Sequence, residues 1–231
     1  MEIINNITPE EEMRLKRIDE DCKALHVLIP PKAFLEYSIT GVDGKPRKKF
    51  KSLSKSWVRN AYTQIAQQLG GLYPTKHGSA AAGPGSLYFR STDNYSLGEE
   101  HSFIAAENDW IGATGDANAG IIAGTDNTAE DFDDYQLGSK CTHGTSTNQL
   151  QYGQHSAIGI WSTANKKWTA THTRVLTNSS SASIDVKETG ILIGIYTSPQ
   201  LLINRDVLPA TETVGVGESI SITYTIEITF P

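Results

Sequence analysis

The stretch at residues 220–230, next to the end of the chain, alternates strictly between apolar and polar side chains. Ile220, Ile222 and Tyr224 begin the apolar series, and serine, threonine or glutamate stands at every position between its members. Successive side chains of a strand point to opposite faces of a sheet, so the segment predicts one strand with a buried face and a solvent-facing face. Its β-branched and aromatic content indicates an antiparallel sheet in a mainly β protein.

Further strand candidates recur at intervals of roughly eight to twelve residues, which are typical of a sandwich or a barrel. They lie at residues 33–40, 48–53, 120–124, 150–152, 158–161, 168–178, 182–186, 190–196, 201–208 and 217–230. No linker divides this region. The sequence therefore predicts one antiparallel β-sandwich domain over residues 32–231.

Two helices are predicted beside the strands. Apolar residues that include Trp57 and Tyr62 recur at helical spacing over residues 54–69, where Gly70 and Gly71 stop the pattern, so we expect one helix packed on the sandwich. Residues 71–118 follow as a long irregular insertion. Long polar loops inside compact domains are usually functional, as binding loops or inter-subunit arms.

Residues 1–31 form a predicted helical arm. Thr8 suits the N-cap and Pro9 the first helical position, with acidic residues in the first turn. The apolar stripe consists of Leu15, Ile18, Cys22 and Leu25. A short helix needs a packing partner, so the arm either packs on its own sheet or docks on a neighbouring subunit.

Composition excludes several classes of protein. The 231-residue chain has a formal net charge of −6, whereas nucleic-acid binding needs a basic patch. One local basic cluster, at residues 45–55, is interpreted as a solvated edge. No apolar run is long enough to span a membrane, and the N-terminus lacks the features of a secretory signal. Cys22 and Cys141 are far apart, so both are expected to be free thiols.

No motif predicts catalysis, a cofactor or a resident metal. The acidic run comprises Asp126, Glu130, Asp131, Asp133 and Asp134. These residues could bind Ca²⁺, but their spacing is not that of an EF-hand, so we expect a solvated turn with Phe132 and Tyr135 pointing inward. His143 near Cys141 supplies only two of the four ligands of structural zinc, and His172 is expected to be a cross-strand partner rather than a base.

Two carbohydrate-related alternatives remain open. Trp110, Trp161 and Trp168 could stack on sugar rings, although each is expected to serve in the core or an interface instead. Glycoside hydrolysis would need paired carboxylates across a groove. The acids that could form such a pair all lie in the irregular middle of the chain: Glu99, Glu100, Glu107, Asp109 and Asp116.

Four scattered stretches resemble one known family. They comprise residues 54–62 (SKSWVRNAY), 120–125 (GIIAGT) with 133–137 (DDYQL), 174–178 (RVLTN) with 188–191 (ETGI), and 204–208 (NRDVL) with 219–226 (SISITYTI). Together they resemble β-rich virion structural proteins of tailed bacteriophages. The resemblance does not extend to residues 72–118 and extends only loosely to the arm.

The resemblance implies a non-enzymatic subunit of a phage virion, in the head decoration, neck, collar or tail. Such a protein assembles in the host cytoplasm with copies of itself and with other virion proteins. We place the expected interfaces on the arm and in the insertion, at Leu15, Ile18, Leu25, Tyr88, Phe89, Tyr95 and Trp110. The main alternative is a carbohydrate-binding module that attaches a particle to host-surface glycan, and a third is a polysaccharide-cleaving enzyme.

Overall fold

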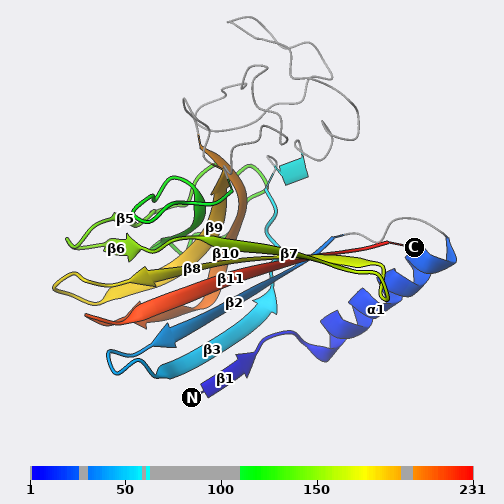
Figure 1. Ribbon diagram of the computed structural model, residues 1–231, viewed down its shortest axis with the longest axis horizontal. Coiled ribbons are helices and arrows are strands. Elements are labelled where there is room, and N and C mark those ends of the chain that lie inside the picture. Colours follow the sequence, from blue (N-terminus) through cyan, green and yellow to red (C-terminus); the bar gives the residue numbers. More distant parts are fainter. Residues whose placement is uncertain (1, 26–30, 59–60, 63–109, 194–199, 231) are drawn as a thin grey trace, which may run out of the picture.

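The computed structural model describes residues 2–25, 31–58, 61–62, 110–193 and 200–230, and it is mainly β (Figure 1). Its elements are β1 (Glu2–Asn5), α1 (Pro9–Ala24), β2 (Lys32–Thr40), β3 (Pro46–Leu53), β4 (Gly120–Gly124), β5 (Thr142–His143), β6 (Gln149–Tyr152), β7 (Ser156–Ser162), β8 (Lys167–Thr177), β9 (Ile184–Ile193), β10 (Leu201–Val214) and β11 (Ser219–Thr229).

The strands form two sheets. The larger sheet has eight strands in the order β1-β3-β2-β11-β8-β6-β5, with β7 also paired to β8, and the smaller has the order β10-β9-β4. Pairing is antiparallel except for β1 with β3 and β5 with β6, which are parallel. The prediction of a β-rich fold is thus confirmed, with parallel pairs added at the two ends of the larger sheet.

One hydrophobic core joins the two sheets. Inward-facing residues of β2 and β11, such as Leu35 and Ile222, share a buried cluster with Ile121 of β4 and Ile191 of β9. The predicted terminal strand is confirmed as β11, which lies between β2 and β8 and buries Ile220, Ile222 and Tyr224. Residues that alternate along β11 therefore build one wall of the core.

The first strand and the first helix precede the sandwich. The helix begins as predicted: Thr8 Oγ1 accepts a hydrogen bond from Glu11 N (3.2 Å), and Glu11 Oε2 accepts one from Thr8 N (2.9 Å). This reciprocal pair satisfies two backbone donors that the helix itself leaves free. The sequence did not predict β1, which pairs with β3 of the same chain and packs Ile4 against the core.

The predicted start of the second helix is wrong. Residues 54–58 are not helical, because their backbone adds to the smaller sheet: Trp57 bridges Asn204, and Val58 N donates to Ile203 O (3.1 Å). Ala61 and Tyr62 are helical, and residues 63–69 lie outside the described residues. Pairing with β10 therefore overrides the helical spacing of the apolar side chains.

One strand replaces two that were predicted. Residues 182–186 and 190–196 are predicted as separate strands. The structure has continuous β9, in which Glu188 and Thr189 are both fully buried. Thr189 Oγ1 donates to Ile122 O (2.7 Å), and Glu188 is paired with an arginine described below. Satisfied buried polar groups let the strand cross the core.

Candidate interaction surface

Strand β7 exposes apolar side chains on both of its faces. Ile158 is 57% exposed, Ile160 62% and Trp161 51%. Ile158 and Ile160 point to one face and Trp161 to the other, since side chains alternate along a strand. Six of the seven residues of β7 are exposed, and the sequence Ser-Ala-Ile-Gly-Ile-Trp-Ser carries no charge. The strand therefore presents an uncharged, largely apolar surface to solvent.

Trp168 of β8 and Phe230, the residue after β11, extend this surface. Trp161 of β7 lies opposite Trp168 of β8 in the antiparallel register, and the ring of Phe230 meets Trp161 edge to face at a centroid distance of 5.4 Å. Trp168 and Phe230 are both exposed. We call Ile158, Ile160, Trp161, Trp168 and Phe230 the β7 surface.

One edge of β7 has no strand beside it in the described parts of the chain. Its seven residues pair with residues 167–173 of β8, and no other described strand pairs with β7 (Figure 1). Exposed edges offer unpaired backbone groups to other strands, and soluble proteins commonly protect them with charges or proline. β7 has neither, so its backbone and side chains both favour protein contact.

The residues predicted as interface are distributed differently. On α1, Leu15 and Ile18 are half-buried and Leu25, just beyond the helix, is exposed. Ion pairs of Asp19 with Lys32 and of Glu11 with Lys55 tie the helix to its own chain. The helix lies at the end of the larger sheet toward which β7 and β11 run (Figure 1). Its apolar stripe remains only partly covered.

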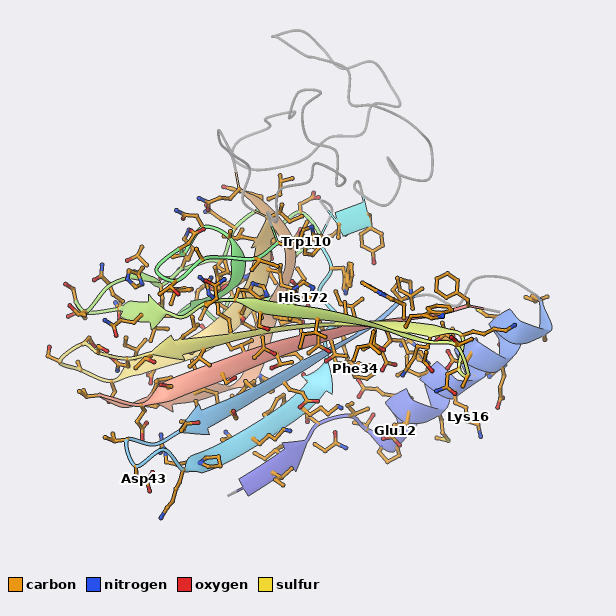
Figure 2. All side chains as sticks on the ribbon, viewed as in Figure 1. Glu12, Lys16, Phe34, Asp43, Trp110 and His172 are labelled. Carbon is orange, nitrogen blue, oxygen red and sulfur yellow. The ribbon has the colours of Figure 1, made fainter. Side chains whose placement is uncertain are left out.

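The other predicted interface residues lie elsewhere. Tyr88, Phe89 and Tyr95 lie outside the described residues. Trp110 is partly buried and packs against the core and against a second, smaller cluster, with its ring 6.0 Å from that of His172 (Figure 2). The second cluster consists of Ala61, Ile193, Leu201 and Ile203. Trp110 is therefore a packing residue at the border of the core, separate from the β7 surface.

Beside Trp110, two buried imidazoles contact each other. Ile121 N donates to His155 Nδ1 (3.3 Å), so the His155 proton is on Nε2, which lies 3.2 Å from His172 Nδ1. Burial lowers the pKa of His155 to about 3, helped by His172 and Arg174, and burial also lowers the pKa of His172. Both rings are neutral at pH 7 and link β8 to β4 by hydrogen bonds. His172 lies opposite Tyr224 of β11 and Ala157 of β7, so it is a cross-strand partner as predicted.

The acidic run is held by an arginine. Arg205 of β10 donates to Asp134 (Nη1–Oδ2, 2.9 Å) and lies near Asp126 (Nη2–Oδ2, 3.5 Å). Glu130 Oε1 accepts from Val207 N (2.9 Å). The expected inward placement of Phe132 is wrong, since this ring is exposed. Within the described residues no group of three or more His, Cys, Asp or Glu could hold a metal.

Glu188 completes the arrangement around Arg205. Its Oε2 accepts from Arg205 Nε (2.7 Å), and its carboxylate also accepts from Gly138 N (3.1 Å) and Ser139 N (2.8 Å). Arg205 donates in addition to the carbonyl of Thr128 (2.9 Å). The pair therefore anchors the loop between β4 and β5 to the smaller sheet.

Arg174 anchors a second loop. Its five N–H groups all donate to backbone carbonyls at 2.6–3.0 Å, while the guanidinium lies 4.8 Å from the ring centroid of Tyr152. The acceptors are the carbonyls of Ala113, Asp116, Ala119, Ile121 and Gly153. Arg174 thus fixes the irregular stretch that leads into β4.

The local basic cluster is neutralised within the chain. Lys48 pairs with Glu212 (2.6 Å), and Lys49 and Lys51 both pair with Glu36 (3.2 and 3.0 Å). These contacts join neighbouring strands and the two sheets. They leave less free positive charge than the sequence alone indicates.

Sequence reasoning missed the central residues of this surface. Ile158 and Ile160 are predicted only as members of a strand at residues 158–161, while Trp161 is a candidate for sugar stacking. The useful signal was the absence of charge over residues 156–162 together with apolar residues on both alternations. Periodicity alone could not separate an exposed edge strand from a buried one.

Comparison with protein-family models, with curated proteins and with solved structures finds no match for the chain. The structure places no helix among the described residues that is long and apolar enough to cross a membrane. Both cysteines are free, as predicted.

Proposed function

We propose that the chain is a non-enzymatic structural subunit of a tailed-phage virion, in the head decoration, neck, collar or tail. It acts by binding copies of itself and other virion proteins, and it reaches the virion by assembly in the host cytoplasm. The sequence blocks that resemble phage virion proteins support the virion assignment. The β7 surface is the single structural observation that carries the interface role.

The physical case rests on the exposed apolar area. Contiguous apolar patches on soluble proteins commonly mark sites of protein contact, and interface centres are depleted of charge and enriched in aromatic residues. The β7 surface combines two isoleucines, two tryptophans and a phenylalanine without a charged member. Its strands belong to an eight-stranded sheet, so its shape is set before binding and little ordering is needed.

The buried arginines support the same assignment indirectly. Both guanidinium groups are used within the fold, Arg174 on backbone carbonyls and Arg205 on carboxylates and carbonyls. The paired imidazoles are likewise used in hydrogen bonds and kept neutral by burial. The polar groups of these clusters are thus satisfied by contacts within the fold. Among the described residues, the β7 surface is an exposed feature that these contacts do not explain, and it is apolar.

A carbohydrate-binding module is the second candidate, because Trp161 and Trp168 are exposed and adjacent. Aromatic faces can stack on sugar rings. Phe230, however, already contacts Trp161, and an array of isoleucines on the opposite face of β7 has no role in sugar stacking. This candidate predicts binding to a glycan array that is lost in Trp161→Ala.

The assembly role predicts a defined oligomer in solution. Light scattering should give a mass that is a multiple of the monomer, and removal of residues 1–28 should reduce it, because the half-buried stripe of α1 is available to a neighbour. Since that deletion also removes β1, the double variant Leu15→Glu/Ile18→Glu should be measured beside it. Met13→Glu, at an exposed apolar position of the same helix, is the matched control.

A mass that is unchanged by both alterations would remove α1 from the interface. A monomer in every case, together with glycan binding that depends on Trp161, would overturn the structural role in favour of the carbohydrate-binding module.

A further inference from the structure

The sequence of β7 is nearly symmetric about its central glycine. From either end it reads serine, a second residue, isoleucine and then Gly159: Ser-Ala-Ile-Gly-Ile-Trp-Ser. An antiparallel pair of identical strands related by a two-fold axis through Gly159 would therefore place Ile158 opposite Ile160 and Ser156 opposite Ser162. The one unequal pair, Ala157 opposite Trp161, matches a small side chain with a large one.

We infer that two copies of the chain pair edge to edge through β7, antiparallel and centred on Gly159. This deepens the proposed function, on which it rests, by naming the partner of the β7 surface as a second copy. Such a contact is isologous, so each residue of the strand is used twice. The two larger sheets would become one continuous sheet across the dimer, with backbone hydrogen bonds between the strands and side chains aligned on both faces.

Charge favours this partner. The long strands β2, β3, β8 and β11 of the same sheet all carry charged residues, whereas β7 carries none. The chain has a net charge of −6, so two copies repel at long range. Like charges that lie directly opposite one another destabilise a pair of strands. Pairing through β7 places no charged residues opposite one another, so it avoids this cost.

Gly159 gives the axis a compatible shape. A Cβ atom at this position would come within 3.3 Å of Trp168 Cζ2, so the glycine leaves room for the indole to lie against the strand. At a two-fold axis the two glycines face each other, which leaves space for Trp161 of each copy to lie across Ala157 of the other. The isoleucines cover the opposite face.

The area required is within reach of this surface. A stable interface buries roughly 800 Å² from each partner, and a fully exposed aromatic side chain offers about 150–250 Å². Trp161, Trp168 and Phe230 are 51%, 38% and 42% exposed, so each can supply about half of that area or less. Trp161 and the two isoleucines lie on the pairing strand itself, Trp168 lies on the neighbouring strand β8, and Phe230 contacts the Trp161 ring. Seven paired residues of backbone and their immediate flanks supply the remainder.

Cysteine cross-linking tests the register. In a Cys22→Ser background, Ile158→Cys protein is mixed with Ile160→Cys protein under a mild oxidant. Buried Cys141 stays in place, because burial raises the pKa of its thiol to about 12. Opposed residues have Cα atoms about 4.5–5.5 Å apart, within disulfide range, so the mixture should give covalent dimers in high yield. Either variant alone places its cysteines diagonally, roughly 7–8 Å apart, and should cross-link at least tenfold less.

A charge substitution tests the interface itself. Ile160→Lys puts a lysine opposite Ile158 twice in each dimer and should halve the mass at a concentration where the unmodified protein is dimeric. Val175→Lys is the matched control, since Val175 is exposed on the same face of the larger sheet but on β8, away from β7. Circular dichroism should confirm that both variants are folded.

Two results would overturn the inference. One is a cross-linking yield in the mixture no greater than in the single variants, and the other is an unchanged mass for Ile160→Lys. If the mass nevertheless falls in the α1 variants, the structural role survives with a different contact. A protein that stays monomeric at all concentrations overturns the β7 dimer, while virion membership is tested separately by the composition of particles.

Discussion

Arg174→Lys is expected to lower the free energy of unfolding by about 3 to 5 kcal/mol. Lysine keeps the positive charge but cannot reach five carbonyl oxygens that surround a planar guanidinium. Several buried acceptors would lose their donor, and the remaining ammonium would be buried without adequate partners. Urea denaturation, with the m-value checked for two-state behaviour, measures the change.

Arg47→Lys is the control for this substitution. Arg47 forms its ion pair with Glu218 at the protein surface, where such pairs contribute less than about 1 kcal/mol. A loss for Arg174→Lys no larger than for Arg47→Lys would show that the carbonyl contacts do not hold the fold together. The stretch before β4 should also become susceptible to proteolysis in Arg174→Lys, because Arg174 binds the carbonyls of Ala113, Asp116 and Ala119.

Glu188→Gln is expected to cost about 3 kcal/mol or more. The glutamate is fully buried and accepts from Arg205 and from two backbone N–H groups. A glutamine has the same shape but carries an amide nitrogen, which would face one of these donors, and it leaves Arg205 without its buried counter-charge. Removal of one partner from a buried ion pair is much more costly than removal of both.

The matching control is Glu227→Gln, which breaks a partly exposed pair with Lys167 (2.9 Å) and should cost less than about 1 kcal/mol. The double variant Glu188→Met/Arg205→Met removes both buried charges and should be less destabilised than Glu188→Gln. Equal losses for Glu188→Gln and Glu227→Gln would contradict the assigned role of the buried pair.

The fold could be predicted from the sequence where side chains alternate in and out of water. Strands β2, β8 and β11 follow such patterns, β4 is a short buried apolar run, and α1 follows its capping residues. Prediction failed where a distant partner decides the conformation. Residues 54–58 have helical spacing, but Ser56 O accepts from Arg205 N (3.0 Å), and this pairing with β10 holds them extended.

Buried polar residues limited the prediction of the candidate site as well. Glu188 lies between two segments that are predicted as separate strands. It is nevertheless buried, because its carboxylate pairs with Arg205, which lies 17 positions further along the chain. In the same way, Asp126 and Asp134 read as solvated acids until the fold brings them to Arg205. No local pattern specifies a partner at that separation in the sequence.

The sequence blocks on which the proposed virion role rests meet one another in space. Asp134, Glu188 and Arg205 come from three different blocks and form one cluster, while Ser54 Oγ donates to Asp206 Oδ2 (2.8 Å). Burial raises the pKa of Asp206, and Ser54, Asn204 and Lys55 N–H oppose this by donating to its carboxylate. These motif residues hold the sandwich together, whereas the β7 surface lies outside the blocks.

A two-fold contact through β7 restricts the kind of assembly that the chain can form. An isologous interface closes on itself, whereas rings are built from heterologous, head-to-tail contacts. Dimers through β7 therefore suit a shell surface, which offers two-fold positions, better than the ring of a neck or tail. Among the proposed virion locations, the β7 inference favours head decoration.

The proposed function requires that the chain is part of a virion. The most direct measurement is quantitative mass spectrometry of purified tailed-phage particles released from cells that carry the gene for this chain. If the chain is a virion subunit, its peptides should occur in fixed stoichiometry to the other particle proteins and should be retained through repeated purification. Abundant protein in the lysate together with its absence from the purified particles would contradict the proposed function.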